Sequence, residues 1–276
     1  MRRPPYLPFL SGPPGLAPGL KPIEEANWFH PDTEAELWLD EKRRLMRARR
    51  ADVFGARPGA DAAMQEAAER IEALVGPGAG VWETPLERAA SSVSDDLCLM
   101  MREGDGFWRL QAASLCAPTF WRLSDKLGEP LAGLHGPVPG ANPDMVGRVH
   151  RMFDALRPGQ VLERFNWTVQ PGPDRFTPSQ DGYKALAATL PEEGALDALW
   201  LRVERQTISK LAETGAVLFT IRVAMDPLRA ALDGEGHAVA FRAAWNGIDP
   251  GLAAYKGWPH YDRTVRAALA EASASR

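Results

Sequence analysis

The chain has 276 residues, 45% of them hydrophobic, and a formal net charge of −4 at pH 7. This composition excludes wholesale disorder and supplies enough apolar surface for one large domain. There is no basic excess that would suit phosphate backbones, so nucleic acid is a poor candidate partner. No stretch approaches the roughly 18 consecutive apolar residues of a membrane span, and we expect a cytoplasmic protein without a membrane partner.

The first 22 residues are rich in proline and glycine, which interrupt every apolar run. A secretory signal peptide needs an uninterrupted apolar segment, so this stretch does not qualify as one. Proline also fixes φ and removes backbone donors. The sequence therefore predicts an extended N-terminal arm over residues 1–22 and a single domain over residues 23–276.

Two helices are predicted after the arm. Residues 34–50 are acidic early and basic late, as the helix dipole favours. We interpret the basic run KRRLMRARR as the end of this helix rather than as a nucleic-acid patch. Residues 61–75 carry apolar side chains near helical spacing and stop at a Gly-Pro-Gly sequence, which predicts the second helix.

The middle of the chain changes to a strand-like period. Residues 96–101 and 107–116 are apolar runs joined by Glu-Gly-Asp-Gly, which predicts a hairpin. Residues 162–170 alternate in polarity, with Arg164 and Asn166 on one face. A further strand is predicted over residues 216–225.

Helices are predicted over residues 145–156, over residues 195–211 and again beyond Pro227. The complete pattern indicates an α+β fold, with a central antiparallel sheet of about five strands and N- and C-terminal helical extensions. Cys98 and Cys116 lie in apolar runs without CxxC spacing, so we expect reduced thiols in the core.

His135 precedes the sequence Gly-Pro-Val-Pro-Gly. Pro137 and Pro139 fix the backbone, so the imidazole is expected on a stiff turn. A neutral imidazole held in this way suits haem iron or another transition metal as an axial ligand. The alternative is an ordinary loop histidine that bonds a backbone carbonyl, and the residues alone leave both interpretations open.

A polar motif, LRVERQT, occupies residues 201–207 and includes Arg202, Glu204 and Arg205. On the predicted helix it is either a solvated surface with ion pairs or an arginine clamp for a carboxylate such as a haem propionate. Arg222 favours the clamp, because a charge within an apolar strand must face water or be paired. The phosphate loop, the nucleophile elbow, the dinucleotide fingerprint and the HExxH zinc motif are all missing from the sequence.

Several motifs together resemble the haem-dependent oxidative N-demethylase family. They are GLKPI at residues 19–23, DDLCLM at 95–100, WRLSDKLGEPLAGLHGPVPG at 121–140, RFNW at 164–167, and LRVERQT followed by TGAVLFTIR at 214–222. The matching segments are spread from about residue 19 to residue 266. The resemblance implies a PAS-like antiparallel sheet that encloses a b-type haem.

The resemblance also implies an activity, which is oxidation of a small methylated amine with O₂ and release of formaldehyde. Electrons would come from NADPH through separate partner subunits that carry FMN and an iron–sulfur cluster. The residues implied for cofactor binding are His135 as the iron ligand, with Lys126, Arg164, Arg202 and Arg205, and those implied for catalysis are Glu204, Asn166 and Arg222. Where the family often has Leu-His-x-Pro, this chain has Arg-Phe-Thr-Pro at residues 175–178.

Two other functions stay open on the sequence. The same fold suits a haem-based gas or redox sensor, since fold does not determine function. A haem-free relative that binds another small molecule is the third interpretation.

Overall fold

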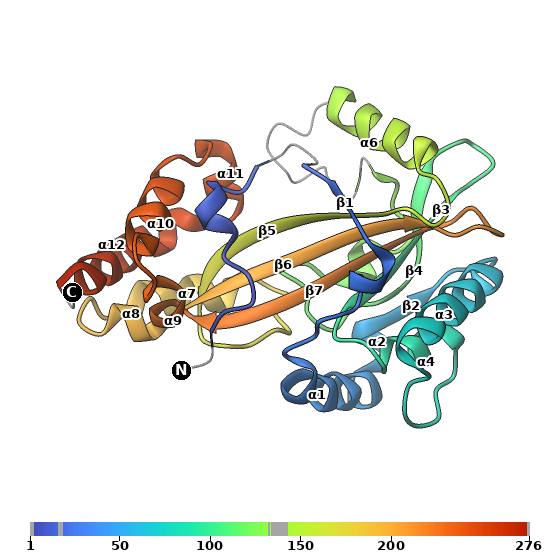
Figure 1. The fold of residues 1–276 in the computed structure, drawn as a ribbon, viewed down its shortest axis with the longest axis horizontal. Helices are drawn as coiled ribbons and strands as arrows, with labels where there is room; N and C mark the ends of the chain where they lie inside the picture. Colours follow the sequence, from blue (N-terminus) through green and yellow to red (C-terminus); the bar gives the residue numbers. More distant parts are fainter. Residues whose placement is uncertain (1–2, 16–18, 132, 134–142, 275–276) are drawn as a thin grey trace.

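A seven-stranded antiparallel sheet forms the centre of the computed structural model, which describes residues 3–15, 19–131, 133 and 143–274 (Figure 1). The strands are β1 Lys21–Ile23, β2 Phe54–Ala56, β3 Asp96–Arg102, β4 Trp108–Ser114, β5 Val161–Pro171, β6 Leu199–Lys210 and β7 Val217–Pro227. Their order across the sheet is β1-β5-β6-β7-β3-β4-β2. The long strands β5, β6 and β7 are therefore neighbours, and the two three-residue strands lie at the edges.

Helices surround this sheet, which confirms the α+β class. They are α1 Ala35–Ala48, α2 Arg50–Val53, α3 Asp61–Val75, α4 Pro85–Ala90, α6 Pro143–Ala155, α7 Asp181–Thr189, α8 Ala195–Ala198, α9 Leu228–Leu232, α10 His237–Asn246, α11 Pro250–Tyr255 and α12 Trp258–Ala274. Short 3-10 helices occur at η1 Pro8–Ser11, η2 Glu25–Asn27 and η3 Leu123–Asp125. Within the described ranges, every helix is too short or too polar to cross a membrane.

Most predicted elements are present, but the helix expected over residues 195–211 is wrong. Only its first four residues are helical, as α8, and β6 begins at Leu199. Strand β6 is buried on both sides, and both Arg202 and Arg205 have exposed fractions of 5% or less. Because charged side chains stand on both faces of this strand, the alternation that identifies a strand is lost.

The sheet has two distinct faces, which we name after two residues of β6. The Glu204 face carries Arg202, Glu204 and Gln206 of that strand, and the Arg205 face carries Val203, Arg205 and Thr207. The pairing register places Asn166 of β5 opposite Glu204 and Arg222 of β7 opposite Arg205. In Figure 1 the N-terminal segment passes in front of β5, β6 and β7, on the Arg205 face.

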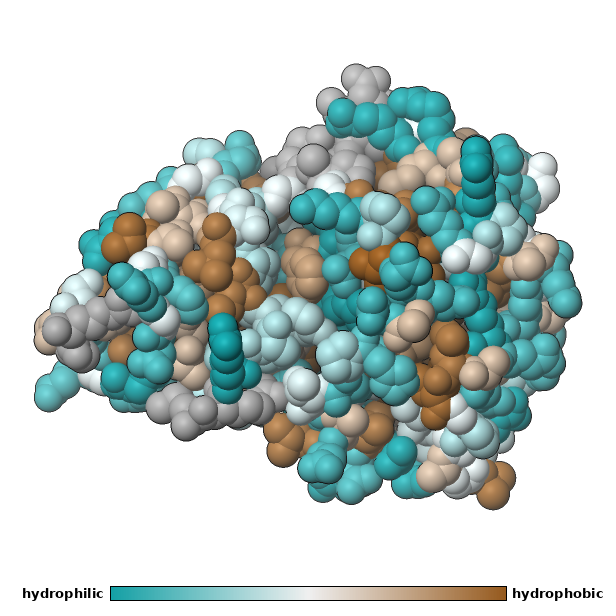
Figure 2. Space-filling model, viewed as in Figure 1, coloured by the Kyte–Doolittle hydropathy of each residue, from teal (hydrophilic) through white to brown (hydrophobic). Residues whose placement is uncertain are grey.

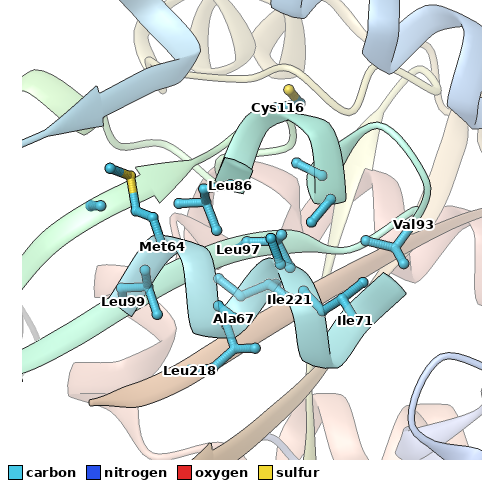
Figure 3. Close-up of a cluster of buried hydrophobic side chains, with 14 of the residues drawn as sticks. Met64, Ala67, Ile71, Leu86, Val93, Leu97, Leu99, Cys116, Leu218 and Ile221 are labelled. Atoms are coloured by element: carbon cyan, nitrogen blue, oxygen red, sulfur yellow. The ribbon is translucent and has the colours of Figure 1, made fainter. Parts of the chain in front are cut away.

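Helices α3 and α4 cover another part of the Arg205 face. Figure 3 shows Ala67 and Ile71 of α3 beside Leu97 of β3 and Leu218 of β7, with Leu86 of α4 close by. All five side chains are fully buried. The burial of each large aliphatic side chain contributes about 1.5–3 kcal/mol, so this cluster fixes both helices on the sheet.

Aromatic side chains join the C-terminal helices and the N-terminal arm to β5. The rings of Trp245 and Trp258 stack with centroids 3.9 Å apart, and Trp258 lies 5.0 Å from Trp167. Phe9 of η1 is 1% exposed and packs edge-on against Phe241. The region expected to be an extended arm thus contains a 3-10 helix that buries Phe9 and, at Lys21–Ile23, the edge strand β1.

On the side shown in Figure 2, brown hydrophobic residues form separate small patches among hydrophilic ones. The most exposed large hydrophobic residues, Val81 and Val239, are 97% and 73% exposed and come from different parts of the chain. Hydrophobic residues scattered in this way are normal on a protein surface.

Candidate functional site

A hydrogen-bonded carboxylate, that of Glu204, stands in the middle of the Glu204 face and is half-buried. Asn166 Nδ2 and Gln206 Nε2 donate to Glu204 Oε2 at 3.1 and 2.7 Å, and the Thr119 hydroxyl donates to Oε1. Burial alone raises the pKa of Glu204, but the charge of Arg202 and these hydrogen bonds lower it overall. Glu204 is therefore an ionised carboxylate at neutral pH.

Arg202, two residues before Glu204, is 0% exposed and joins two loops to the sheet. Its Nη2 donates to the carbonyl oxygen of Ala117 at 2.7 Å, and its Nη1 donates to that of Asp174 at 3.3 Å. Its Nε donates to Thr119 Oγ1 at 2.8 Å. Arg202 therefore holds Thr119 in place beside Glu204.

The guanidinium of Arg202 makes two further kinds of contact. It donates to Gln170 Oε1 at 3.3 Å and, through both terminal nitrogens, to the carbonyl oxygen of Arg175 at 3.2 Å. A guanidinium has five N–H donors, and all of them are used here. Arg202 thus has no donor left for a haem propionate, contrary to the expectation from the sequence.

Arg164, in contrast, has donors that no residue of the described ranges uses. It lies on the Glu204 face, opposite Gln206, and its Nη2 donates to the carbonyl oxygen of Gly15 at 3.2 Å. Within the described part of the chain this is its only hydrogen bond. Burial lowers the pKa of Arg164, so the guanidinium is partly desolvated and suited to a carboxylate partner.

Lys126 and the predicted iron ligand belong to one segment. Lys126 Nζ donates to the carbonyl oxygen of Gly133 at 2.9 Å, which ties down the chain two residues before His135. His135 itself lies outside the described residues. Among the residues that the structure does describe, no three His, Cys, Asp or Glu side chains gather into a metal site.

Arg205 and Arg222 are separated from the other predicted site residues. Adjacent residues of a strand point to opposite faces, so Arg205 cannot share a face with Glu204. Arg205 pairs with Glu163, and Arg222 pairs with Asp95 at 2.7 Å. Arg222 also lies 3.8 Å from Asp32, and the two arginines donate to the carbonyl oxygens of Asn27, Trp28, Phe29 and Pro31. These two arginines anchor the N-terminal segment, and the candidate site is built without them.

Lys256 belongs to the site although no sequence motif marked it. It follows α11 directly, is half-buried, and its Nζ donates to Asn166 Oδ1 at 2.8 Å and to the carbonyl oxygen of Trp167 at 3.3 Å. Burial lowers the pKa of Lys256 to about 8, and the charge of Glu204 partly opposes that shift. Lys256 and Asn166 are 90 residues apart in the chain, so no local sequence pattern indicates that they are in contact.

Phe120, next to Thr119, has a strained backbone with φ 61°. It is the only non-glycine residue with positive φ in the described ranges. Its N–H donates to the carbonyl oxygen of Thr177 at 2.8 Å, and its ring packs against Tyr183 with centroids 5.6 Å apart. Bulky residues in this conformation are rare and concentrate at functional sites.

An apolar cluster continues the Glu204 face along the sheet. Ile208 of β6 and Leu162 of β5 pack there with Phe219 of β7, Trp121 and Phe153 of α6. The face is thus polar around Glu204 and apolar beyond it. Ligand sites commonly combine an apolar wall with a few placed polar groups.

These features define an α+β protein with an ionised carboxylate beside an apolar wall. The family model described as "Haem-dependent oxidative N-demethylase, alpha subunit-like" matches residues 75–266, which is more than half of the chain. The chain belongs to this family, and the resemblance seen in its motifs is confirmed.

Proposed function

We propose that this protein is the haem-binding subunit of a monooxygenase that demethylates a small methylated amine with O₂ and releases formaldehyde. The observation that carries the proposal is the ionised Glu204 carboxylate, held on the half-buried face of the sheet in a chain of this family. A carboxylate beside an apolar wall suits a small cation with methyl groups, and a methylated amine is such a cation when protonated.

The described residues fit a haem in two respects. The apolar cluster with Trp121 and Phe219 offers a surface for the macrocycle, and the remaining donors of Arg164 suit a propionate. We propose His135 as the iron ligand; Lys126 bonds the carbonyl oxygen of Gly133, two residues earlier in the chain. Bound haem would supply the activation of O₂. The antiparallel core β4-β3-β7-β6-β5 supports a PAS-like arrangement.

Glu204 is proposed to bind the amine through Oε1. Its Oε2 already accepts hydrogen bonds from Asn166 and Gln206, whereas from the residues that the structure describes Oε1 accepts only that of Thr119. A carboxylate oxygen has two acceptor sites, so Oε1 has one left for the N–H of an ammonium group. At this atom Glu204 would orient the substrate and take its proton.

We propose that the electrons come from NADPH through separate FMN and iron–sulfur subunits. The name of the family, "alpha subunit-like", supports a multi-subunit enzyme. Cys98 and Cys116 are buried free thiols and do not form the four-cysteine set that a cluster needs. Free thiols also support the proposed cytoplasmic location, because reducing compartments keep cysteines unpaired.

The test combines haem loading with product analysis. We expect the purified protein to bind haem stoichiometrically, with an absorption spectrum of histidine ligation that His135→Ala abolishes. With a reductase supply and a panel of methylated amines, formaldehyde should form, and Glu204→Gln should reduce its rate at least about 10-fold. Haem binding without formaldehyde would support a gas or redox sensor, and failure to bind haem would overturn the proposal.

A further inference from the structure

Lys256 and Glu204 are joined by the side chain of Asn166. Lys256 Nζ donates to Asn166 Oδ1 at 2.8 Å, and Asn166 Nδ2 donates to Glu204 Oε2 at 3.1 Å. Asn166 stands directly opposite Glu204 in the register of β5 and β6. One amide group therefore connects an ammonium on the C-terminal helices with a carboxylate on the sheet.

The chemistry of the two ends permits only one orientation of this amide. An ammonium has donors and no acceptor, whereas an ionised carboxylate has acceptors and no donor. The oxygen of Asn166 must therefore face Lys256, and its nitrogen must face Glu204. Without the ammonium, Glu204 alone would orient the amide, and Asn166 Oδ1 would lose its cationic donor.

The backbone of Lys256 is itself held in place. Asp249 caps the N-terminus of helix α11, and its side chain accepts a hydrogen bond from the N–H of Leu252 at 2.9 Å. Gly257 has φ 72°, and a Cβ there would lie 2.4 Å from Gln180 Nε2. The left-handed conformation favours glycine at this turn, which follows Lys256 directly.

We propose that Lys256 is a positioning residue of the site: its ammonium orients Asn166 so that the amide donates to Glu204 and keeps Oε2 engaged. Oε1 is then the atom that meets the ligand. The charged groups that act on Lys256 are Glu204 from β6 and Arg164 from β5. The inference rests on the proposed function only in assigning the amine to Glu204.

The experiment measures Glu204 directly in the haem-free protein. The side-chain carboxyl ¹³C shift of Glu204 and the Asn166 side-chain amide signals are followed against pH by NMR in the parent and in Lys256→Met and Lys256→Arg. We expect Lys256→Met to raise the pKa of Glu204 by about one unit and to shift or broaden the Asn166 amide signals. Lys256→Arg keeps a cationic donor, so the pKa of Glu204 and the Asn166 amide signals should both stay close to those of the parent.

Lys184→Met is the matched control. Lys184 is a half-buried lysine of α7 whose ammonium has no hydrogen bond within the described residues, so its removal should leave both signals unchanged. If Lys256→Met does not fold, Lys256→Gln keeps a donor without the charge and should still raise the pKa of Glu204. Unchanged Glu204 and Asn166 signals in the folded Lys256 variant would overturn the proposal.

The same variants separate this inference from the proposed activity. With haem, a reductase supply and a methylated amine, the acidic limb of kcat/KM should move upward in pH by the shift measured for Glu204. If the NMR effects occur but no variant releases formaldehyde, the positioning role stands and the proposed function fails. If formaldehyde is released but the NMR signals do not move, the positioning role fails.

Discussion

Arg205 and Arg222 stand directly opposite each other on β6 and β7, so two positive charges lie side by side on one buried face of the sheet. Like charges in this arrangement are destabilising unless each is neutralised. Here Glu163 pairs with Arg205, and Asp95 pairs with Arg222, which also has Asp32 at 3.8 Å. The arginine pair therefore depends on these acidic partners, of which Asp95 is the nearer one to Arg222.

Asp95→Asn should be strongly destabilising. Asp95 and Arg222 have side-chain exposures of 0% and 2%, so the substitution removes the nearer carboxylate from a buried arginine and leaves it Asp32, at 3.8 Å. We expect the free energy of unfolding, measured by urea denaturation, to fall by about 3–5 kcal/mol. Asp197→Asn removes the exposed partner of Arg229 and should cost no more than about 1 kcal/mol. Equal losses in the two variants would contradict the assigned role.

Arg202 and Arg164 should respond differently to substitution by Met. Arg202→Met leaves buried carbonyl oxygens without donors, and we expect the haem-free protein to lose at least about 3 kcal/mol of stability. Arg164→Met should change the stability of the haem-free protein little but weaken haem binding roughly 10-fold or more. Thermal denaturation without haem and haem titration measure the two effects. A loss of haem affinity in Arg202→Met without a loss of stability would argue for direct contact with the cofactor.

Glu204 should stabilise the fold in a pH-dependent manner. The pKa of Glu204 in the folded protein lies below its ordinary value of 4.5, so folding favours the ionised form. This contribution is present above about pH 4.5 and is lost as the pH falls through the folded-state pKa. Glu204→Gln should thus be less stable than the parent at pH 7, and the difference should shrink below pH 4.5. Urea denaturation at a series of pH values measures the difference in the free energy of unfolding between the two proteins. A difference that grows as the pH falls would contradict the lowered pKa of Glu204.

Phe9 makes the N-terminal arm part of the fold. Its ring is 1% exposed and lies between Trp167 and Phe241, with centroids 6.3 and 5.3 Å away. Phe9→Ala should therefore cost about 3–5 kcal/mol in the free energy of unfolding. Leu10, which is 49% exposed, offers a control within the same turn, and Leu10→Ala should change stability by only about 0.5 kcal/mol. A small effect of Phe9→Ala would show that the arm is dispensable.

The sequence predicts much of this fold because most elements show a simple period. Helix α3 was predicted with its observed bounds, and the strands at residues 96–102 and 161–171 were predicted within one residue at each end. Strand β6 was missed because Arg202 and Arg205 point to opposite faces and are both buried. The groups that bind these two arginines come from distant segments of the chain. The residue pattern of one strand gives no information about such partners.

The site was predictable only in part, for the same reason. Arg164 and Asn166 stand on one face, as the alternation of their strand predicts, whereas Glu204 joins that face only because its segment is a strand and not the predicted helix. The motif around Glu204 also contains Arg205, but the geometry of a strand sends that side chain to the other face. Lys256 approaches Asn166 from the C-terminal helices, so their contact exists only in three dimensions.

The two edge strands have a consequence for solubility. Strands β1 and β2 have three residues each, and Pro22, in the middle of β1, has no N–H to offer. A further strand needs a row of unpaired backbone groups to join a sheet, and β1 and β2 are too short to present one. Strands β6, β7 and β3 each have a hydrogen-bonded neighbour on both sides. The two edge strands themselves are thus poor templates for edge-to-edge aggregation when the protein is concentrated.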